Sequence, residues 1–184
     1  MHSLVQIQDI VPNIALDLRY ATTHNITGRV LYPLARAYVL REVADGLAKV
    51  QDELAASGLG LKVWDAYRPL SVSLALWEVT LEAEKKYVAD PSLGSVHNRG
   101  CAVDVTLIDL ATGQEVSMPS AFDDFSERAW PSYKDAPRHN LDMRDLLIKT
   151  MENHGFTVNP HEWWHFDWND WAKYPVLDTP IEAL

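Results

Sequence analysis

Cysteine and long hydrophobic runs are nearly missing from this chain of 184 residues. Cys101 is the single cysteine, so no disulfide can form within the chain, and a reducing compartment is permitted. Nowhere do about 18 apolar residues run together, as a transmembrane helix requires. The first residues also lack the basic and apolar regions of a signal peptide, so the chain as given is expected to be cytoplasmic.

The chain also has fewer basic than acidic residues. The chain has 16 Lys and Arg against 26 Asp and Glu, which gives a net charge of −10. Affinity for nucleic acid or for an anionic membrane surface depends on Lys and Arg, so neither is an expected partner. The chain has no Gly/Ser-rich linker and no internal repeat, and its 47% apolar and 23% charged residues are typical of a globular protein. These features predict one domain over residues 1–184.

Hydrophobic periodicity predicts a mixture of helices and strands. Helical spacing of apolar residues occurs over about 35–57, 71–87 and 141–153. Short apolar or alternating runs, which are typical of strands, occur at about 14–20, 61–65, 102–107, 156–158 and 163–168. Thr112 and Gly113 predict a hairpin turn, and residues 118–137 are expected to form a long functional loop. This order has no βαβ rhythm, so the predicted fold class is α+β, with a mostly antiparallel central sheet flanked by helices in a single compact domain.

Two stretches combine the residue types that a hydrolytic zinc site needs. Such a site takes three protein ligands of the His and carboxylate type, keeps one position open and has a base nearby. In the first stretch, His97 is followed by Asp104 on a predicted strand, and Gly100 between them lets the backbone turn. In the second, Glu162 precedes His165 among large aromatic side chains. The two stretches are therefore candidates for one metal centre.

These stretches resemble the S-x-H-x-x-G-x-A-x-D and E-x-x-H motifs of the lysostaphin, D-Ala-D-Ala metallopeptidase and sonic hedgehog superfamily. Within it the chain is similar to the VanX-type D-alanyl-D-alanine dipeptidases, because residues 17–22, 66–69 and 118–123 also fit, in the family's order. The resemblance spans roughly residues 10–170. It implies an antiparallel sheet flanked by helices, a small closed cavity for a D,D-dipeptide, and zinc-dependent hydrolysis of D-alanyl-D-alanine.

The resemblance also implies roles for the residues of the metal centre. His97, Asp104 and His165 become the ligands of one zinc ion per chain. Glu162 becomes the general base that takes a proton from the attacking water and later delivers it to the leaving amine. Arg68 becomes the group that polarises the scissile carbonyl and stabilises the oxyanion. The implied activity is that of a zinc metallopeptidase.

Further residues are carried over to the substrate pocket. Asp123 is expected to receive the free ammonium group of the dipeptide, while Ser95 and Tyr20 line the pocket and form hydrogen bonds with the substrate. Cys101 stands where the family often has a different residue. Its thiol either packs without a role or competes for the metal.

Other interpretations of the same residues stay open. His161 to His165 also fits the H-E-x-x-H pattern of zincin metalloproteases, which requires a helix and a further ligand. The Trp and Phe residues there favour a strand, and only Glu182 remains downstream as a ligand, so this hypothesis is disfavoured. Arg68 could instead form a surface salt bridge, and Asp123 could belong to a plain acidic loop.

Related activities would use the same ligands. A D,D-carboxypeptidase or a peptidoglycan endopeptidase would differ only in the walls of its cavity, and a non-catalytic zinc-binding module would lack the base. The sequence leaves open whether the role is vancomycin resistance or the recycling of D-Ala-D-Ala from the cell wall. It also leaves open whether the chain forms homo-oligomers.

Overall fold

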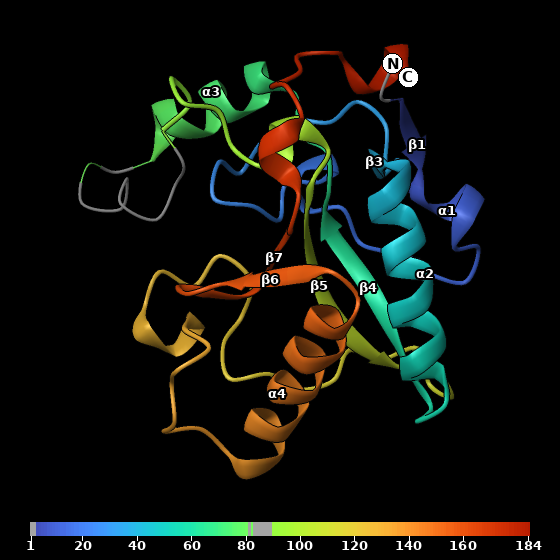
Figure 1. The fold of residues 1–184 in the computed structure, drawn as a ribbon. Coiled ribbons are helices and arrows are strands. Elements are labelled where there is room, and N and C mark those ends of the chain that lie inside the picture. Colours follow the sequence, from blue (N-terminus) through green and yellow to red (C-terminus); the bar gives the residue numbers. More distant parts are fainter. Residues whose placement is uncertain (1–2, 81, 83–89) are drawn as a thin grey trace.

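A central sheet organises the molecule. The computed structural model describes residues 3–80, 82 and 90–184, and within them the strand order is β2-β4-β5-β7-β6. The strands are β2 (Ala15–Leu16), β4 (Leu59–Asp65), β5 (Ala102–Asp109), β6 (Phe156–Asn159) and β7 (Glu162–Trp168). β2 and β4 are parallel, and the other neighbours are antiparallel. The predicted α+β class with a mostly antiparallel sheet is therefore confirmed (Figure 1).

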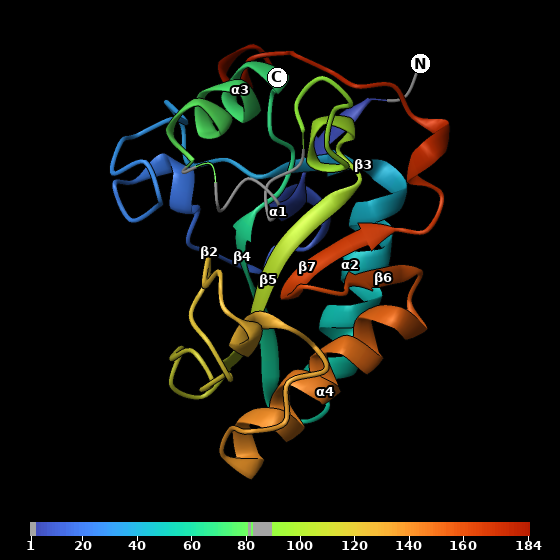
Figure 2. The ribbon, with the colours of Figure 1, turned by 90° about the vertical axis from the view of Figure 1, so that its left-hand side faces the viewer.

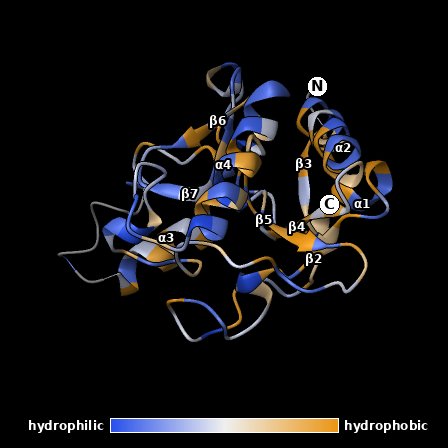
Figure 3. Cartoon of the chain, turned by 90° about the horizontal axis from the view of Figure 1, so that it is seen from below, coloured by the Kyte–Doolittle hydropathy of each residue, from blue (hydrophilic) through white to orange (hydrophobic). Residues whose placement is uncertain are grey.

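Two helices pack against this sheet and enclose the hydrophobic core with it. They are α2 (Arg41–Ala55), which packs on β4, and α4 (Arg138–Asn153), which packs on β6. Both helices also contact each other, and Figures 1 and 2 show them side by side. α2 carries both hydrophobic and hydrophilic residues (Figure 3), and its buried residues Val43, Leu47, Val50 and Leu54 recur at helical spacing on one face. None of the helices in the described part of the chain is long and apolar enough to cross a membrane.

α2 approaches the sheet closely because of Gly46. A Cβ atom at this position would lie 2.9 Å from Cζ3 of Trp168 and 3.0 Å from Cε2 of Phe156. The missing side chain leaves room for these two aromatic rings, which pack edge to face at a centroid distance of 5.2 Å. The core therefore joins α2 directly to β6 and to β7, the strand that carries Glu162 and His165.

Several predicted boundaries were wrong. The helix predicted from residue 35 begins at Arg41, because Tyr38–Leu40 forms strand β3 and pairs with β1 (Leu4–Gln6). The short helix α1 (Ile7–Ile10) was not predicted. The strand predicted at 14–20 is reduced to β2, because Arg19–Ala21 forms a 3₁₀ turn.

Other predicted elements agree with the structure. β4, β5, β6, β7 and α4 occupy the expected segments within a few residues. The hairpin turn is present, with Gly113 at φ 71° and its N–H donating to the Asp109 carbonyl. Residues 118–137 form a loop with one short 3₁₀ turn at Glu127–Ala129. The helix predicted over 71–87 is α3 (Leu70–Val79), and residues 81 and 83–87 of that prediction lie outside the described residues.

Candidate active site

The site forms around three residues that lie side by side on three neighbouring strands of the sheet. Asp65 on β4 pairs with Asp104 on β5, and Asp104 pairs with His165 on β7. His97 joins this row from the 3₁₀ turn that precedes β5. Residues 97 and 104 are thus brought to the same place by a turn of the backbone at Gly100, whose φ is +67°. A Cβ atom there would lie 2.4 Å from a methyl carbon of Leu4, so the turn also needs a small residue.

Three of these side chains present ligand atoms to one another. Oδ1 of Asp104 lies 3.0 Å from Nδ1 of His165 and 3.4 Å from Nε2 of His97. The two ring nitrogens are 3.1 Å apart. Ligand atoms about 2.1 Å from a tetrahedral zinc ion lie roughly 3.4 Å from one another. The donor set and its spacing therefore fit a divalent metal ion.

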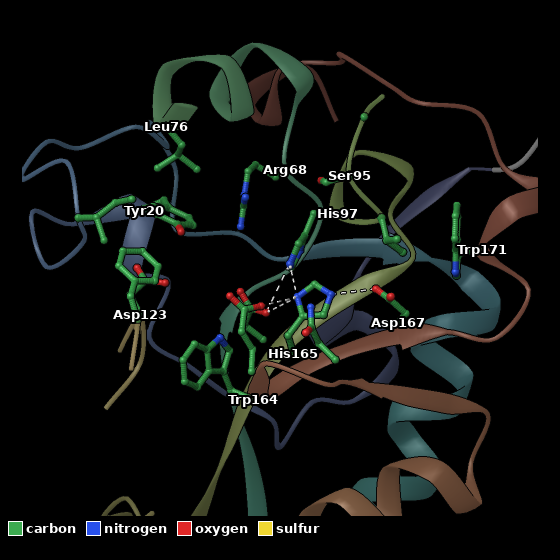
Figure 4. Close-up of a pocket in the computed structure, with 17 residues that line it drawn as sticks. Tyr20, Arg68, Leu76, Ser95, His97, Asp123, Trp164, His165, Asp167 and Trp171 are labelled. Carbon is green, nitrogen blue, oxygen red and sulfur yellow. Dashed lines mark hydrogen bonds and ion pairs between the residues drawn. The ribbon is translucent and has the colours of Figure 1, made fainter. Parts of the chain in front are cut away.

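Each imidazole is also held from its far side. Nδ1 of His97 lies 2.6 Å from the carbonyl oxygen of Ala66, and Nε2 of His165 lies 2.9 Å from Oδ1 of Asp167. Both acceptors favour a proton on the ring nitrogen that they face, which leaves the other nitrogen free to act as a ligand. Figure 4 shows the rings of His97 and His165 close together, with Asp167 on the far side of the His165 ring from His97.

Glu162 reaches the same cavity through an irregularity in β7. Glu162 and His165 are three residues apart, so a regular strand would send them to opposite faces. The pairing with β6 is shifted, however: Val158 pairs with Phe166, but the next residue, Asn159, pairs with Glu162. Oε2 of Glu162 consequently lies 3.9 Å from Nδ1 of His165. Burial raises the pKa of Glu162 to about 7, against the lowering effect of His165.

Arg68 is held above the metal-binding residues by a carboxylate that the sequence analysis did not single out. Asp65 is fully buried, and its Oδ2 accepts hydrogen bonds from Nε of Arg68 at 2.9 Å and from Nη2 at 2.6 Å. Oδ1 of Asp65 accepts a hydrogen bond from the hydroxyl of Tyr32 at 2.7 Å. Burial lowers the pKa of Arg68, but Asp65 together with Tyr20, Tyr32 and Asp104 outweighs burial and raises the pKa, so the guanidinium stays charged. An acidic residue at the end of an apolar strand, three positions before a candidate arginine, was the signal for this partner.

The remaining predicted residues line the same cavity. Its volume is about 250 Å³, and its walls include Tyr20, Arg68, Ser95, Asp123 and Glu162. The guanidinium carbon of Arg68 lies 4.9 Å from the ring centroid of Tyr20. Figure 4 shows Tyr20 and Asp123 together on one side of the cavity and Ser95 close to His97.

Asp123 is an unusual carboxylate. Its backbone has φ 57°, in the left-handed region that residues other than glycine rarely adopt, and its Oδ2 is buried with no hydrogen-bond partner among the described residues. Burial raises its pKa to about 8, and the charges of Asp104 and Glu162 add to this effect. A buried acceptor without a partner is costly, so this geometry suits a cationic ligand that supplies the missing donor.

Asp123 should therefore cost stability at alkaline pH. The folded protein retains the proton on this carboxyl up to about pH 8, whereas the unfolded chain releases it near pH 4. The free energy of unfolding consequently falls as pH rises between these values. In protein stripped of metal, Asp123→Asn should raise the free energy of unfolding by about 1–2 kcal/mol at pH 8 and by less at pH 5. Urea denaturation measures this, Asp124→Asn is the matched control, and equal effects at both pH values would contradict it.

Two alternatives from the sequence do not fit this geometry. Residues 162–165 lie on strand β7 and not on a helix, so His161 and His165 do not share a helix face, and the zincin hypothesis was wrong. Cys101 belongs to the hydrophobic core and lies outside the described group of His97, Asp104 and His165. Burial raises the pKa of its thiol to about 12, which disfavours the thiolate that a metal would need.

Comparisons with known proteins cover nearly the whole chain. A family model described as D-ala-D-ala dipeptidase matches residues 1–182. A D-alanyl-D-alanine dipeptidase of Escherichia coli (strain K12) is 36% identical over 174 residues, which are 95% of this chain and 89% of the relative. Proteins of the same name from Enterococcus faecium and Enterococcus faecalis are 32% and 34% identical; the matches cover 96% and 95% of this chain and 96% and 91% of those relatives.

Proposed function

Because the chain belongs to the D-Ala-D-Ala dipeptidase family of metallopeptidases, we propose that it hydrolyses D-alanyl-D-alanine with one zinc ion held by His97, Asp104 and His165. The observation that carries the proposal is that these three ligand atoms, Glu162 and Arg68 border one small cavity. Its volume of about 250 Å³ is below the range of about 300–1,000 Å³ that is usual for drug-sized ligands, which favours a small substrate.

A bound zinc ion would supply Lewis-acid chemistry, polarising the scissile carbonyl and making water more acidic. Glu162 is the proposed general base. Its carboxylate lies beside His165 and borders the cavity, so it can take a proton from the attacking water and pass it to the leaving amine. Burial raises the pKa of Glu162, which strengthens its carboxylate as a proton acceptor.

Arg68 is the proposed electrophilic partner. Two of its N–H groups are engaged by Asp65, and Figure 4 shows the side chain extending between Tyr20 and His97. A fixed positive charge there would stabilise the negative charge that develops on the carbonyl oxygen during attack. Since Asp65 and Tyr32 hold the group before substrate binds, little reorganisation is needed in the transition state.

Asp123 is the proposed site for the substrate's ammonium group. Its buried Oδ2 has no partner among the described side chains, and it lies beside Tyr20 in the cavity. Ser95, near His97, and the hydroxyl of Tyr20 would form hydrogen bonds with the rest of the dipeptide. A partner for each end of a dipeptide would favour short substrates over longer chains.

The zinc-loaded protein should release free alanine from D-alanyl-D-alanine, and elemental analysis should find one zinc per chain.

N-acetylated D-alanyl-D-alanine lacks the ammonium group, and it should be cleaved at least about tenfold more slowly because Asp123 then lacks its partner. A peptidoglycan precursor with a pentapeptide end should also be a poor substrate. No alanine from metal-loaded protein would refute the activity, and equal cleavage of the pentapeptide would identify a D,D-carboxypeptidase instead.

A further inference from the structure

Asp167 lies at the edge of the metal centre without belonging to the three proposed ligands. Its Oδ1 is 2.9 Å from Nε2 of His165, on the opposite side of the imidazole ring from Asp104. The two nitrogens of an imidazole point away from each other, so Asp167 cannot reach the point where the three ligand atoms meet. Figure 4 shows Asp167 at the side of the His165 ring that faces away from His97.

The backbone of Asp167 is fixed on both sides. Near the end of β7 it pairs with Ala102 on β5 and with Thr157 on β6. Asp167 also follows His165 by two residues, which places both side chains on the same face of a strand. The side chain of Asp167 retains 28% exposure, so its contact with the imidazole comes from this placement and not from complete burial.

We propose that Asp167 is a positioning residue that keeps the proton of His165 on Nε2 and thereby presents Nδ1 to the metal. Asp167 does so by accepting the Nε2–H hydrogen bond, which also fixes the rotation of the ring. His97 is positioned in the same manner by the carbonyl of Ala66, but a backbone acceptor cannot be removed by substitution. His165 therefore offers the direct test. This inference rests on the proposed zinc site and adds a residue to it.

Comparing Asp167→Ala with Asp167→Asn shows whether the hydrogen bond to His165, and not only the packing of the side chain, supports zinc binding. Alanine removes the acceptor, and the zinc dissociation constant should rise about 10–100-fold, the usual cost of losing such a partner. Asparagine keeps an acceptor oxygen of the same shape, so Asp167→Asn should restore most of the affinity. Asp170→Ala removes an exposed carboxylate that pairs with Lys173, and it should leave the dissociation constant unchanged.

The position of the proton can be observed directly. In zinc-loaded protein labelled with ¹⁵N-histidine, long-range ¹H–¹⁵N spectra should show His165 protonated at Nε2 and His97 protonated at Nδ1. Asp167→Ala should weaken or shift the His165 signal and leave that of His97 unchanged. Unchanged zinc affinity and an unchanged His165 signal in Asp167→Ala would overturn this inference alone. Failure of the unsubstituted protein to bind zinc would instead refute the proposed metal site, so the two failures are distinguishable.

Discussion

Glu162→Gln should lower kcat for D-alanyl-D-alanine by about 10²–10⁴-fold, the usual contribution of a general acid–base group. Glutamine has nearly the same shape but cannot take a proton from water. Glu162 is not among the three proposed ligands, although its Oε2 lies 3.9 Å from Nδ1 of His165. The substitution should therefore leave one zinc bound per chain. Alanine release and elemental analysis on the same sample measure both quantities.

The position of Glu162 and a matched control make the result of Glu162→Gln easy to interpret. The side chain of Glu162 is half-buried and its carboxyl lies beside His165 in the cavity. The matched control is Glu152→Gln, an identical change at an exposed position of α4, which should leave kcat unchanged. A Glu162→Gln enzyme that keeps normal turnover with zinc bound would remove Glu162 from the mechanism. Loss of zinc together with activity would show that it acts on metal binding.

The candidate ligands were accessible from the sequence because each motif is nearly local. Asp104 follows His97 by seven residues, and Glu162 precedes His165 by three, so a motif can record both spacings. The resemblance then supplied the pairing of two stretches that lie far apart in the chain. The structure adds the physical basis of this pairing: Asp104 and His165 are direct partners on neighbouring antiparallel strands.

The partners of these residues were harder to predict. Asp65 and Asp167 act through contacts that depend on the fold, with Arg68 in one case and His165 in the other. A lone Asp on a strand is ordinarily a solvated residue, so its sequence environment carries a weak signal. Asp167 could have been found from its position two residues after a candidate ligand on a predicted strand, because such residues share a face.

The errors in the fold have a similar origin. Val39 and Leu40 fit the helical spacing of the segment that follows them, but both are buried in strand β3, which pairs with β1. A strand of three residues is too short to show the alternation that identifies strands. Its existence depends on a partner more than thirty residues away in the chain, and local periodicity contains no information on that partner.

Arg68→Lys should lower kcat about 10²-fold while the protein remains folded. Lysine keeps the positive charge, which a buried Asp65 needs as a partner, so the large destabilisation expected from an unpaired buried carboxylate is avoided. One ammonium group cannot reproduce the two hydrogen bonds to Asp65 and still present a donor in the direction of the scissile carbonyl. The planar guanidinium can do both, because its N–H groups form a rigid fork.

Whether Arg68→Lys changes kcat or KM tests the proposed role of Arg68 in the transition state. An interaction made only in the transition state lowers kcat and kcat/KM together, whereas one made equally with the bound substrate raises KM alone. A fall in kcat with little change in KM is therefore the expected result, and a rise in KM alone would assign Arg68 to substrate binding. Arg41→Lys is the control, because this exposed arginine pairs with Asp45 and lies on α2, outside the cavity.

Tyr32 and Arg68 both form hydrogen bonds with Asp65, so Tyr32 helps to hold the carboxylate that positions Arg68. Tyr32→Phe should therefore lower kcat as well, but by less than Arg68→Lys.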